Sequence, residues 1–217
     1  MLDPNWDMID GDAAHEIEVL NYSNQVNVIE ALFHFLCHHG QVTENGCSHY
    51  PNENVVRELH RTGTLFLLLH PGEYRDSPVH LAKADGTVVY RPPHHDQVPD
   101  LMRQFVIDIS KMWASHGPIE TAAFALWRIN WIHPFKNGNG RTARAFSYAC
   151  LCLKLGFMPG GSPTVIDLIM RNKPEFEQAL AAGDQRFAAT GQPDLVQLEQ
   201  FLLKLFMQQL EAIPNPG

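Results

Sequence analysis

The chain has 217 residues, of which 45% are hydrophobic and 18% are charged. This composition predicts one globular domain with a small appendage and disfavours a disordered chain, because the apolar fraction is large enough to build a core. The formal net charge of −8 disfavours general nucleic-acid binding, because an acidic surface repels phosphate backbones, although a local basic pocket can still hold one nucleotide.

In chain order, the first half predicts two helices. Apolar residues recur at helical spacing from Asn24 to His38, and a second helix is expected from Glu53 to Leu69 with Asn52 as its N-terminal cap. The N-terminus is acidic and polar, and the longest apolar run is far shorter than the roughly 20 residues of a membrane span. We therefore expect a cytoplasmic protein without a membrane partner.

The four cysteines show no CxxC spacing. Cysteines of this kind in a cytoplasmic protein are expected to be reduced and buried. The sequence therefore predicts free thiols at four positions: Cys37, Cys47, Cys150 and Cys152.

A β-hairpin is predicted next, because Asp85-Gly86 lies between the β-prone runs 79–81 and 87–90. Pro92-Pro93 then ends the second strand. Arg75 and Lys83 flank the hairpin and are predicted to be ordinary surface charges, with contact to a target or a nucleotide as the alternative.

The rest of the chain predicts helices, so the fold class is all-α with one β-hairpin. The helix after Pro118 is apolar on most sides, which is typical of a helix buried in the centre of a domain. Trp113, Trp127 and Trp131 lie on apolar stripes and are expected to pack in the core. The expected helices are Gln97 to Trp113, Ile119 to Ile132, Asn139 to Leu155, Lys173 to Ala182 and Asp194 to Leu210.

The loop between two of these helices carries the strongest functional signal. Gly138-Asn139-Gly140 at the start of a helix can form a nest of N–H groups that binds anions. Arg141 and Arg144 share one face of that helix, and guanidinium groups bind phosphate. His133 begins the loop and can act as a general base near neutral pH. Together these residues favour phosphoryl or nucleotidyl transfer.

Each of these features alone has a simpler interpretation: a turn, a surface histidine or a solvated pair of arginines. Their combination within twelve residues favours one shared ligand. The adjacent pairs His38-His39 and His94-His95 raise the question of a zinc site, but no HExxH motif occurs. We interpret both pairs as solvated, with His94-His95 close enough to the hairpin to touch a target.

The segment from His133 to Arg144, HPFKNGNGRTAR, closely resembles the signature of the Fic family (Fic/Doc superfamily), HPFx(D/E)GNGRxxR. Flanking segments look like the family's flap and neighbouring helices, so the resemblance covers roughly 53–205. It implies a Fic-like helical bundle with the hairpin as a flap over the loop. The expected domains are an N-terminal helical extension packed on the core (1–52), the Fic domain (53–210) and a C-terminal tail (211–217).

The resemblance implies a protein adenylyltransferase, which moves AMP from ATP to a Tyr, Thr or Ser hydroxyl of a target protein. It assigns the general base to His133 and the loop anchor to Phe135. It assigns nucleotide binding to Gly138, Asn139, Gly140, Arg141 and Arg144. Target docking by strand pairing is assigned to a flap formed by Val79, His80, Leu81, Thr87, Val88, Val89 and Tyr90.

Two departures from the family pattern matter. Asn137 replaces the acidic residue that helps to hold Mg²⁺, and a neutral amide is a weaker ligand for this cofactor. The inhibitory motif (S/T)xxxE(G/N) of many relatives has no match, so any restraint on Arg144 is expected from an antitoxin-like partner or self-association. The alternatives are therefore a non-catalytic or weakly active relative that binds nucleotide or a partner protein, or a transferase that uses another nucleotide or phosphate-linked donor.

Overall fold

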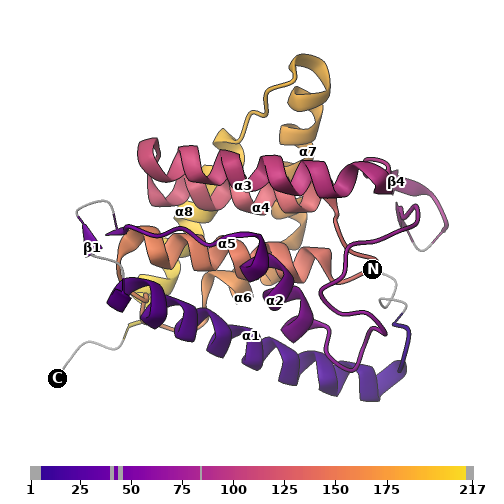
Figure 1. The fold of residues 1–217 in the computed structure, drawn as a ribbon, viewed down its shortest axis with the longest axis horizontal. Coiled ribbons are helices and arrows are strands. Elements are labelled where there is room, and N and C mark those ends of the chain that lie inside the picture. The colour runs from indigo at the N-terminus through magenta and orange to yellow at the C-terminus, as the bar shows by residue number, and fades with distance from the viewer. Residues whose placement is uncertain (1–5, 40–41, 44–45, 84, 214–217) are drawn as a thin grey trace.

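The computed structural model describes residues 6–39, 42–43, 46–83 and 85–213, and in these residues it contains eight α-helices and two short β-hairpins (Figure 1). The helices are α1 (Gly11–His39), α2 (Glu53–Gly63), α3 (Val98–Ser115), α4 (Pro118–Ile132), α5 (Asn139–Leu155), α6 (Val165–Arg171), α7 (Lys173–Thr190) and α8 (Val196–Glu211). A 3₁₀ turn, η1 (His95–Gln97), leads into α3.

Helices α4 and α5 form the centre of the bundle, with α5 between α4 and α1 (Figure 1). Trp127 on α4 and Phe146 on α5 are at most 1% exposed. Such burial of large side chains is the main source of stability in a fold of this size. The central pair fixes the positions of the two helix ends that flank the candidate loop.

Helix α1 is longer than the predicted helix from Asn24 to His38, because contacts far along the chain stabilise its polar N-terminal half. Asn21 Nδ2 donates to the carbonyl oxygen of Leu65 at 2.8 Å, and Gln25 Nε2 donates to that of Leu59 at 2.6 Å. These bonds dock α1 onto α2 and the segment after it.

Helix α2 ends at Gly63, so the prediction that it continues to Leu69 is wrong. Phe66 has a positive φ of 62°, a conformation that a right-handed helix excludes. Leu67 and Leu68 instead pack in a small cluster with Trp6 and Ala14 from the N-terminal segment.

The predicted flap hairpin is present, with β3 (Leu81–Ala82) paired antiparallel to β4 (Val88–Tyr90) and a register shift between Leu81 and Ala82. The second hairpin, β1 (Val42–Thr43) with β2 (Gly46–Cys47), was not predicted. Helix α6 was also not predicted, and α7 extends to Thr190, beyond the predicted end at Ala182.

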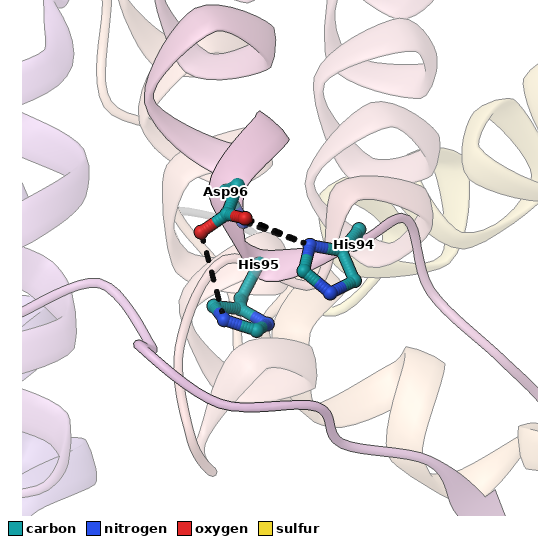
Figure 2. Close-up of side chains that lie close together, drawn as sticks. All are labelled: His94, His95 and Asp96. Carbon is teal, nitrogen blue, oxygen red and sulfur yellow. Dashed lines mark hydrogen bonds and ion pairs between the residues drawn. The ribbon is translucent and has the colours of Figure 1, made fainter.

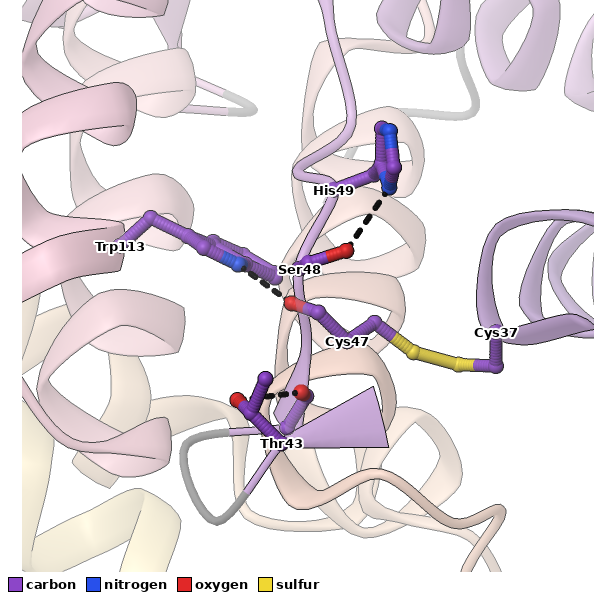
Figure 3. Close-up of a disulfide and its surroundings, with 7 residues drawn as sticks. Cys37, Thr43, Cys47, Ser48, His49 and Trp113 are labelled. Carbon is purple, nitrogen blue, oxygen red and sulfur yellow. Dashed lines mark hydrogen bonds between the residues drawn. A yellow bond between two sulfur atoms is a disulfide. The ribbon is translucent and has the colours of Figure 1, made fainter. Parts of the chain in front are cut away.

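The prediction of four free thiols is wrong for two of the cysteines. Cys37 at the end of α1 and Cys47 in β2 form a disulfide with a Cα–Cα distance of 5.3 Å (Figure 3). The Cys47 carbonyl oxygen accepts a hydrogen bond from Trp113 Nε1 at 2.9 Å, so the crosslink joins α1 to a residue fixed against α3. Cys150 and Cys152 are free and buried in α5, as predicted.

The tryptophans pack as predicted: Trp113 and Trp127 are at most 8% exposed, and the partly buried Trp131 packs against the core. Among the described residues, no helix is both long enough and apolar enough to cross a membrane.

Candidate active site

The loop between α4 and α5 begins and ends in the left-handed backbone region. His133, with φ 53° and ψ 59°, ends α4, and Gly138, with φ 74°, precedes α5. Gly138 is required here, because a Cβ at this position would lie 2.5 Å from Thr64 Cγ2 and a side chain at this φ is strained. The left-handed His133 is uncommon for a residue other than glycine, and such backbone is found at functional sites.

The Asn139 side chain closes the loop on itself. Asn139 Oδ1 accepts from the backbone N–H of Phe135, and its Nδ2 donates to the Phe135 carbonyl oxygen, both at 2.8 Å. The sequence assigned Asn139 to nucleotide binding. Its side-chain amide is hydrogen-bonded within the loop, so only its backbone is available to a ligand. Phe135 is fully buried and stacks on His60 with ring centroids 3.7 Å apart.

His60, which sequence reasoning did not single out, supports the loop from α2. Its Nδ1 accepts from the N–H of Gly72 at 2.8 Å, so Nε2 carries the proton and donates to the Asn137 carbonyl oxygen at 2.9 Å. Burial lowers the pKa of His60 to about 4, so the ring is neutral at physiological pH. The one signal in the sequence was a histidine at an apolar position of an amphipathic helix.

His133 is neutral for the same reason, since burial lowers its pKa to about 4. Its Nδ1 lies 3.3 Å from the Asn130 carbonyl oxygen, which can only accept, so Nδ1 carries the proton. Nε2 then holds the lone pair of the neutral ring. This is the tautomer that a general base requires.

His133 lines a cleft of about 440 Å³. One wall is the flap segment 78–81, and another is formed by Trp6 and Asp7 from the N-terminal segment. Lys136 and Asn137 complete the lining, and Lys136 forms an ion pair with Asp7 that lowers the pKa of this carboxyl group. Val79, His80 and Leu81 of the predicted flap therefore line the same cleft as the predicted base.

The second flap strand lies further from the cleft. Thr87, Val88, Val89 and Tyr90 are not among the residues that line it. Val89 is 54% exposed, whereas the Tyr90 hydroxyl donates to the carbonyl oxygen of Trp131 and fastens the strand to α4. This side of the hairpin thus presents the exposed Val89 and is anchored by the partly buried Tyr90.

Arg75 is buried, so its prediction as a surface charge is wrong: the residue is 6% exposed. Its Nε donates to the His133 carbonyl oxygen at 2.8 Å, and its Nη2 donates to the Pro93 carbonyl oxygen at 2.6 Å. Its backbone N–H donates to the Pro134 carbonyl oxygen at 2.9 Å. Arg75 therefore joins the base of the flap to the catalytic loop, whereas Lys83 is exposed as predicted.

Arg141 does not line the cleft, and α1 supplies its partner. Arg141 Nη2 lies 3.3 Å from Glu18 Oε1, and the same carboxylate oxygen accepts from Trp6 Nε1 at 2.8 Å. Arg141 Nη1 donates to the Gly63 carbonyl oxygen at 3.0 Å. Burial lowers the pKa of Arg141, and Glu18 opposes this shift. Glu18 thus links the proposed phosphate-binding cation to Trp6, which lines the cleft.

Arg144 lies one helical turn further along α5. Its Nε is buried and has no hydrogen-bond partner among the described residues. Burial, and then the like charge of Arg141, lower the pKa of Arg144 to about 10. A buried cationic nitrogen without a partner is costly unless an anion binds it, so this partly buried side chain fits an anionic ligand.

Asn137 fits a Mg²⁺ ion poorly. Its Oδ1 accepts from the backbone N–H of Gly138 at 2.7 Å, which leaves this oxygen a weak ligand. The carboxylate that lines the same cleft, Asp7, is neutralised by Lys136. The donor set around His133 is therefore not that of a dedicated magnesium site.

The two histidine pairs differ from the prediction in one respect. His94 is exposed, with 57% of its side chain accessible, but His95 is largely covered, with 21% accessible. The side chains of His38 and His39 lie outside the part of the chain for which side chains are described.

Comparison with known proteins places this loop in a family. A model of the Fic/DOC family matches residues 50–151. The protein adenylyltransferase fic-1 of Caenorhabditis briggsae is 32% identical over 108 residues, which make up 48% of this chain and only 20% of that protein. The match thus spans about a fifth of this curated relative.

Solved Fic structures share the fold. A Fic family protein from Desulfovibrio desulfuricans G20 superposes with a TM-score of 0.68 at 18% identity, over 94% of this chain and 54% of that chain. A Fic domain containing signaling protein from Bacteroides thetaiotaomicron VPI-5482 gives 0.66 at 18% identity, over 96% and 78%. With the loop from His133 to Arg144 and the flap beside it, these matches show a Fic/DOC domain that includes residues 50–151, in a chain with the fold of solved Fic proteins.

Proposed function

We propose that the chain is a Fic-type adenylyltransferase that moves AMP from ATP to a Tyr, Thr or Ser hydroxyl of a target protein and releases pyrophosphate. One observation carries the proposal. A neutral His133 with its lone pair on Nε2 and an Arg144 whose buried Nε has no partner among the described residues are held by the same loop and helix. A base and an anion site on one loop are what nucleotidyl transfer needs.

His133 has the proton-acceptor role. A target hydroxyl in the cleft donates its proton to His133 Nε2 while its oxygen attacks the α-phosphorus of ATP. The bond between this phosphorus and the oxygen bridging to the β-phosphorus breaks, and pyrophosphate leaves with the electron pair. Asn130 accepts from Nδ1 throughout and thereby stabilises the imidazolium that forms.

The start of α5 has the electrostatic role. The backbone N–H groups of Asn139 and Gly140 and the positive end of the helix dipole favour the negative charge of the phosphates, whereas the Gly138 N–H is bonded to Asn137 Oδ1. Arg144 supplies an unpartnered guanidinium, whereas Arg141 has to exchange Glu18 for phosphate. The charge that grows on the leaving oxygen is stabilised by these groups.

The flap has the docking role. A target segment can add to the exposed backbone of the hairpin as a further strand, which holds its hydroxyl beside His133 without reading a particular sequence. The relative in Caenorhabditis briggsae is named a protein adenylyltransferase, which supports transfer to protein.

We assign no step to Mg²⁺, because Asn137 is a poor ligand for this ion. The phosphates of ATP would then be the main ligands of the ion. Replacing Asn137 with Asp should raise activity at limiting Mg²⁺, since a carboxylate binds this ion better. If the dependence of activity on Mg²⁺ concentration is unchanged in this variant, Asn137 does not limit Mg²⁺ binding.

The engaged Asn137 amide and the Glu18–Arg141 ion pair favour a second candidate, a weakly active relative that binds nucleotide or a partner protein. Incubation with ATP labelled at the α-phosphate, in a cell lysate, tests both. Labelled protein that disappears in His133→Ala but persists in a control variant at the exposed His116 supports transfer. Nucleotide binding without label, under every metal tried, would refute it, and label from UTP, GTP or CDP-choline alone would identify another donor.

A further inference from the structure

Three metal-ligating side chains converge at the base of the flap, where η1 leads into α3. Figure 2 shows His94, His95 and Asp96 turned toward one another. His94 Nδ1 lies 3.3 Å from Asp96 Oδ2, and His95 Nε2 lies 3.6 Å from Asp96 Oδ1. One ligand atom from each residue lies within 4.8 Å of the others.

Both nitrogen–oxygen separations, which run to different oxygens of the one carboxylate, are close to the spacing of neighbouring ligands around a small metal ion. In a tetrahedral site with bonds of about 2.0–2.2 Å, neighbouring ligand atoms are about 3.3–3.6 Å apart. Two imidazole nitrogens and one carboxylate suit Zn²⁺ and its neighbours, whereas Mg²⁺ and Ca²⁺ require oxygen ligands. We propose that His94, His95 and Asp96 form a binding site for a divalent transition metal ion of the zinc class.

Helix capping alone does not account for the cluster. His94 Nδ1 accepts from the Asp96 backbone N–H at 3.4 Å, a long bond that involves His94 only and that a metal ion on Nδ1 would replace, because this nitrogen has one lone pair. The His95 ring lies beside it, with centroids 4.1 Å apart, and directs Nε2 at the same carboxylate. His95 Nδ1 is buried and has no hydrogen-bond partner among the described residues, so no other contact of that nitrogen sets the ring's position.

The backbone that carries the cluster is held in place before any ion binds. Pro92 and Pro93 restrict the chain that enters it, since proline fixes φ near −65°. The Pro93 carbonyl oxygen accepts from Arg75 Nη2 at 2.6 Å, and Arg75 is itself fixed to the catalytic loop. A metal ion here would join the end of the flap to the start of α3. The site is separate from the loop of His133 and does not depend on the transferase proposal.

Zinc titration of the full chain, with any affinity tag removed, tests the site. A chromophoric chelator competes for Zn²⁺ and reports the stoichiometry and affinity. His95→Asn and Asp96→Asn remove one ligand each and keep a polar side chain of similar size. His70→Asn is the matched control, because His70 and Glu73 form an ordinary exposed pair 3.9 Å apart. Circular dichroism without metal checks that each variant is folded.

We expect one tight equivalent of Zn²⁺ in the native chain and in His70→Asn, and affinity at least about tenfold lower in the other two variants. Co²⁺ should show the intense visible absorption of a tetrahedral ion in the same two proteins only. Equal affinity in all four proteins would overturn the assignment, as would no binding by the native chain at micromolar Zn²⁺.

Discussion

Replacing Glu18 with Gln should strengthen nucleotide binding. In the free protein Glu18 pairs with Arg141, the cation assigned to the phosphates, so ATP has to displace this carboxylate. Gln keeps the size of the side chain and an oxygen that can accept from Trp6 Nε1, but it removes the charge that competes with phosphate. The substitution therefore separates the charge of α1 from its packing.

The size of the effect follows from the geometry of the pair. At 3.3 Å the Coulomb attraction is about 5 kcal/mol at an effective dielectric constant of about 20. Glu18 and Arg141 are 20% and 19% exposed, so desolvation and screening offset much of it and leave about 1–2 kcal/mol. The dissociation constant for ATP should then fall about 5-fold to 30-fold.

Isothermal titration with ATP measures this change, on a His133→Ala background so that no transfer occurs during the experiment. Glu16→Gln is the matched control, because Glu16 is an exposed carboxylate two positions earlier on the same helix. Equal affinities for Glu18→Gln and Glu16→Gln would refute competition between Glu18 and phosphate. So would a gain that does not shrink as salt is added, since an ion pair with partly exposed partners is screened.

Three further predictions concern stability. Burial lowers the pKa of His60 and His133 to about 4. Between about pH 6.5 and pH 4 the unfolded chain therefore binds more protons than the native chain, so the free energy of unfolding decreases as the pH is lowered through this window. Urea unfolding should therefore give a free energy lower by about 2 kcal/mol for each histidine at about pH 5 than at about pH 7, and equal values would contradict their neutral burial. Replacing Cys37 and Cys47 with Ser removes a crosslink between residues 10 apart and should lower the free energy of unfolding by about 3 kcal/mol. A reductant should cause the same loss in the native chain and no further loss in the variant. Arg75→Lys should lower the free energy of unfolding by about 2–3 kcal/mol, because one ammonium group cannot donate to all the carbonyl oxygens that the guanidinium contacts. The same substitution should slow label transfer. Normal transfer by a stably folded variant would exclude a role for Arg75 in positioning the base.

The sequence predicted the elements whose ends are encoded locally. Helix α5 has the predicted limits because Gly138 and Gly156, both with φ of 74°, stand directly before and after it. Pro118 likewise marks the start of α4. Helix α6 has only seven residues, and its local start signal, the capping box of Thr164 with Asp167, was overlooked in the sequence.

The residues of the candidate site likewise fall into those that the sequence could identify and those that it could not. His133, Phe135 and the arginines of α5 belong to one continuous motif, so they could be identified from spacing. Glu18 reaches the site only because α1 packs along α5, and Arg75 and His60 reach it through hydrogen bonds to backbone carbonyls, for which sequence carries no spacing rule. The disulfide escaped prediction because the cysteines were assigned to a reducing compartment, although Cys37 and Cys47 are near enough along the chain to pair.

Arg75 has a consequence for any attempt to redirect the proposed transferase to a new target. Exchanging the hairpin is the obvious way to change what docks there, because β3 and β4 are short and contain no buried residue. The same guanidinium, however, grips both the chain that leaves the hairpin and the carbonyl of His133. A grafted flap that shifts Pro93 will therefore move the base as well. Retargeting should begin from grafts that stop before Pro92 and leave this junction intact, so that specificity can change while the chemistry is preserved.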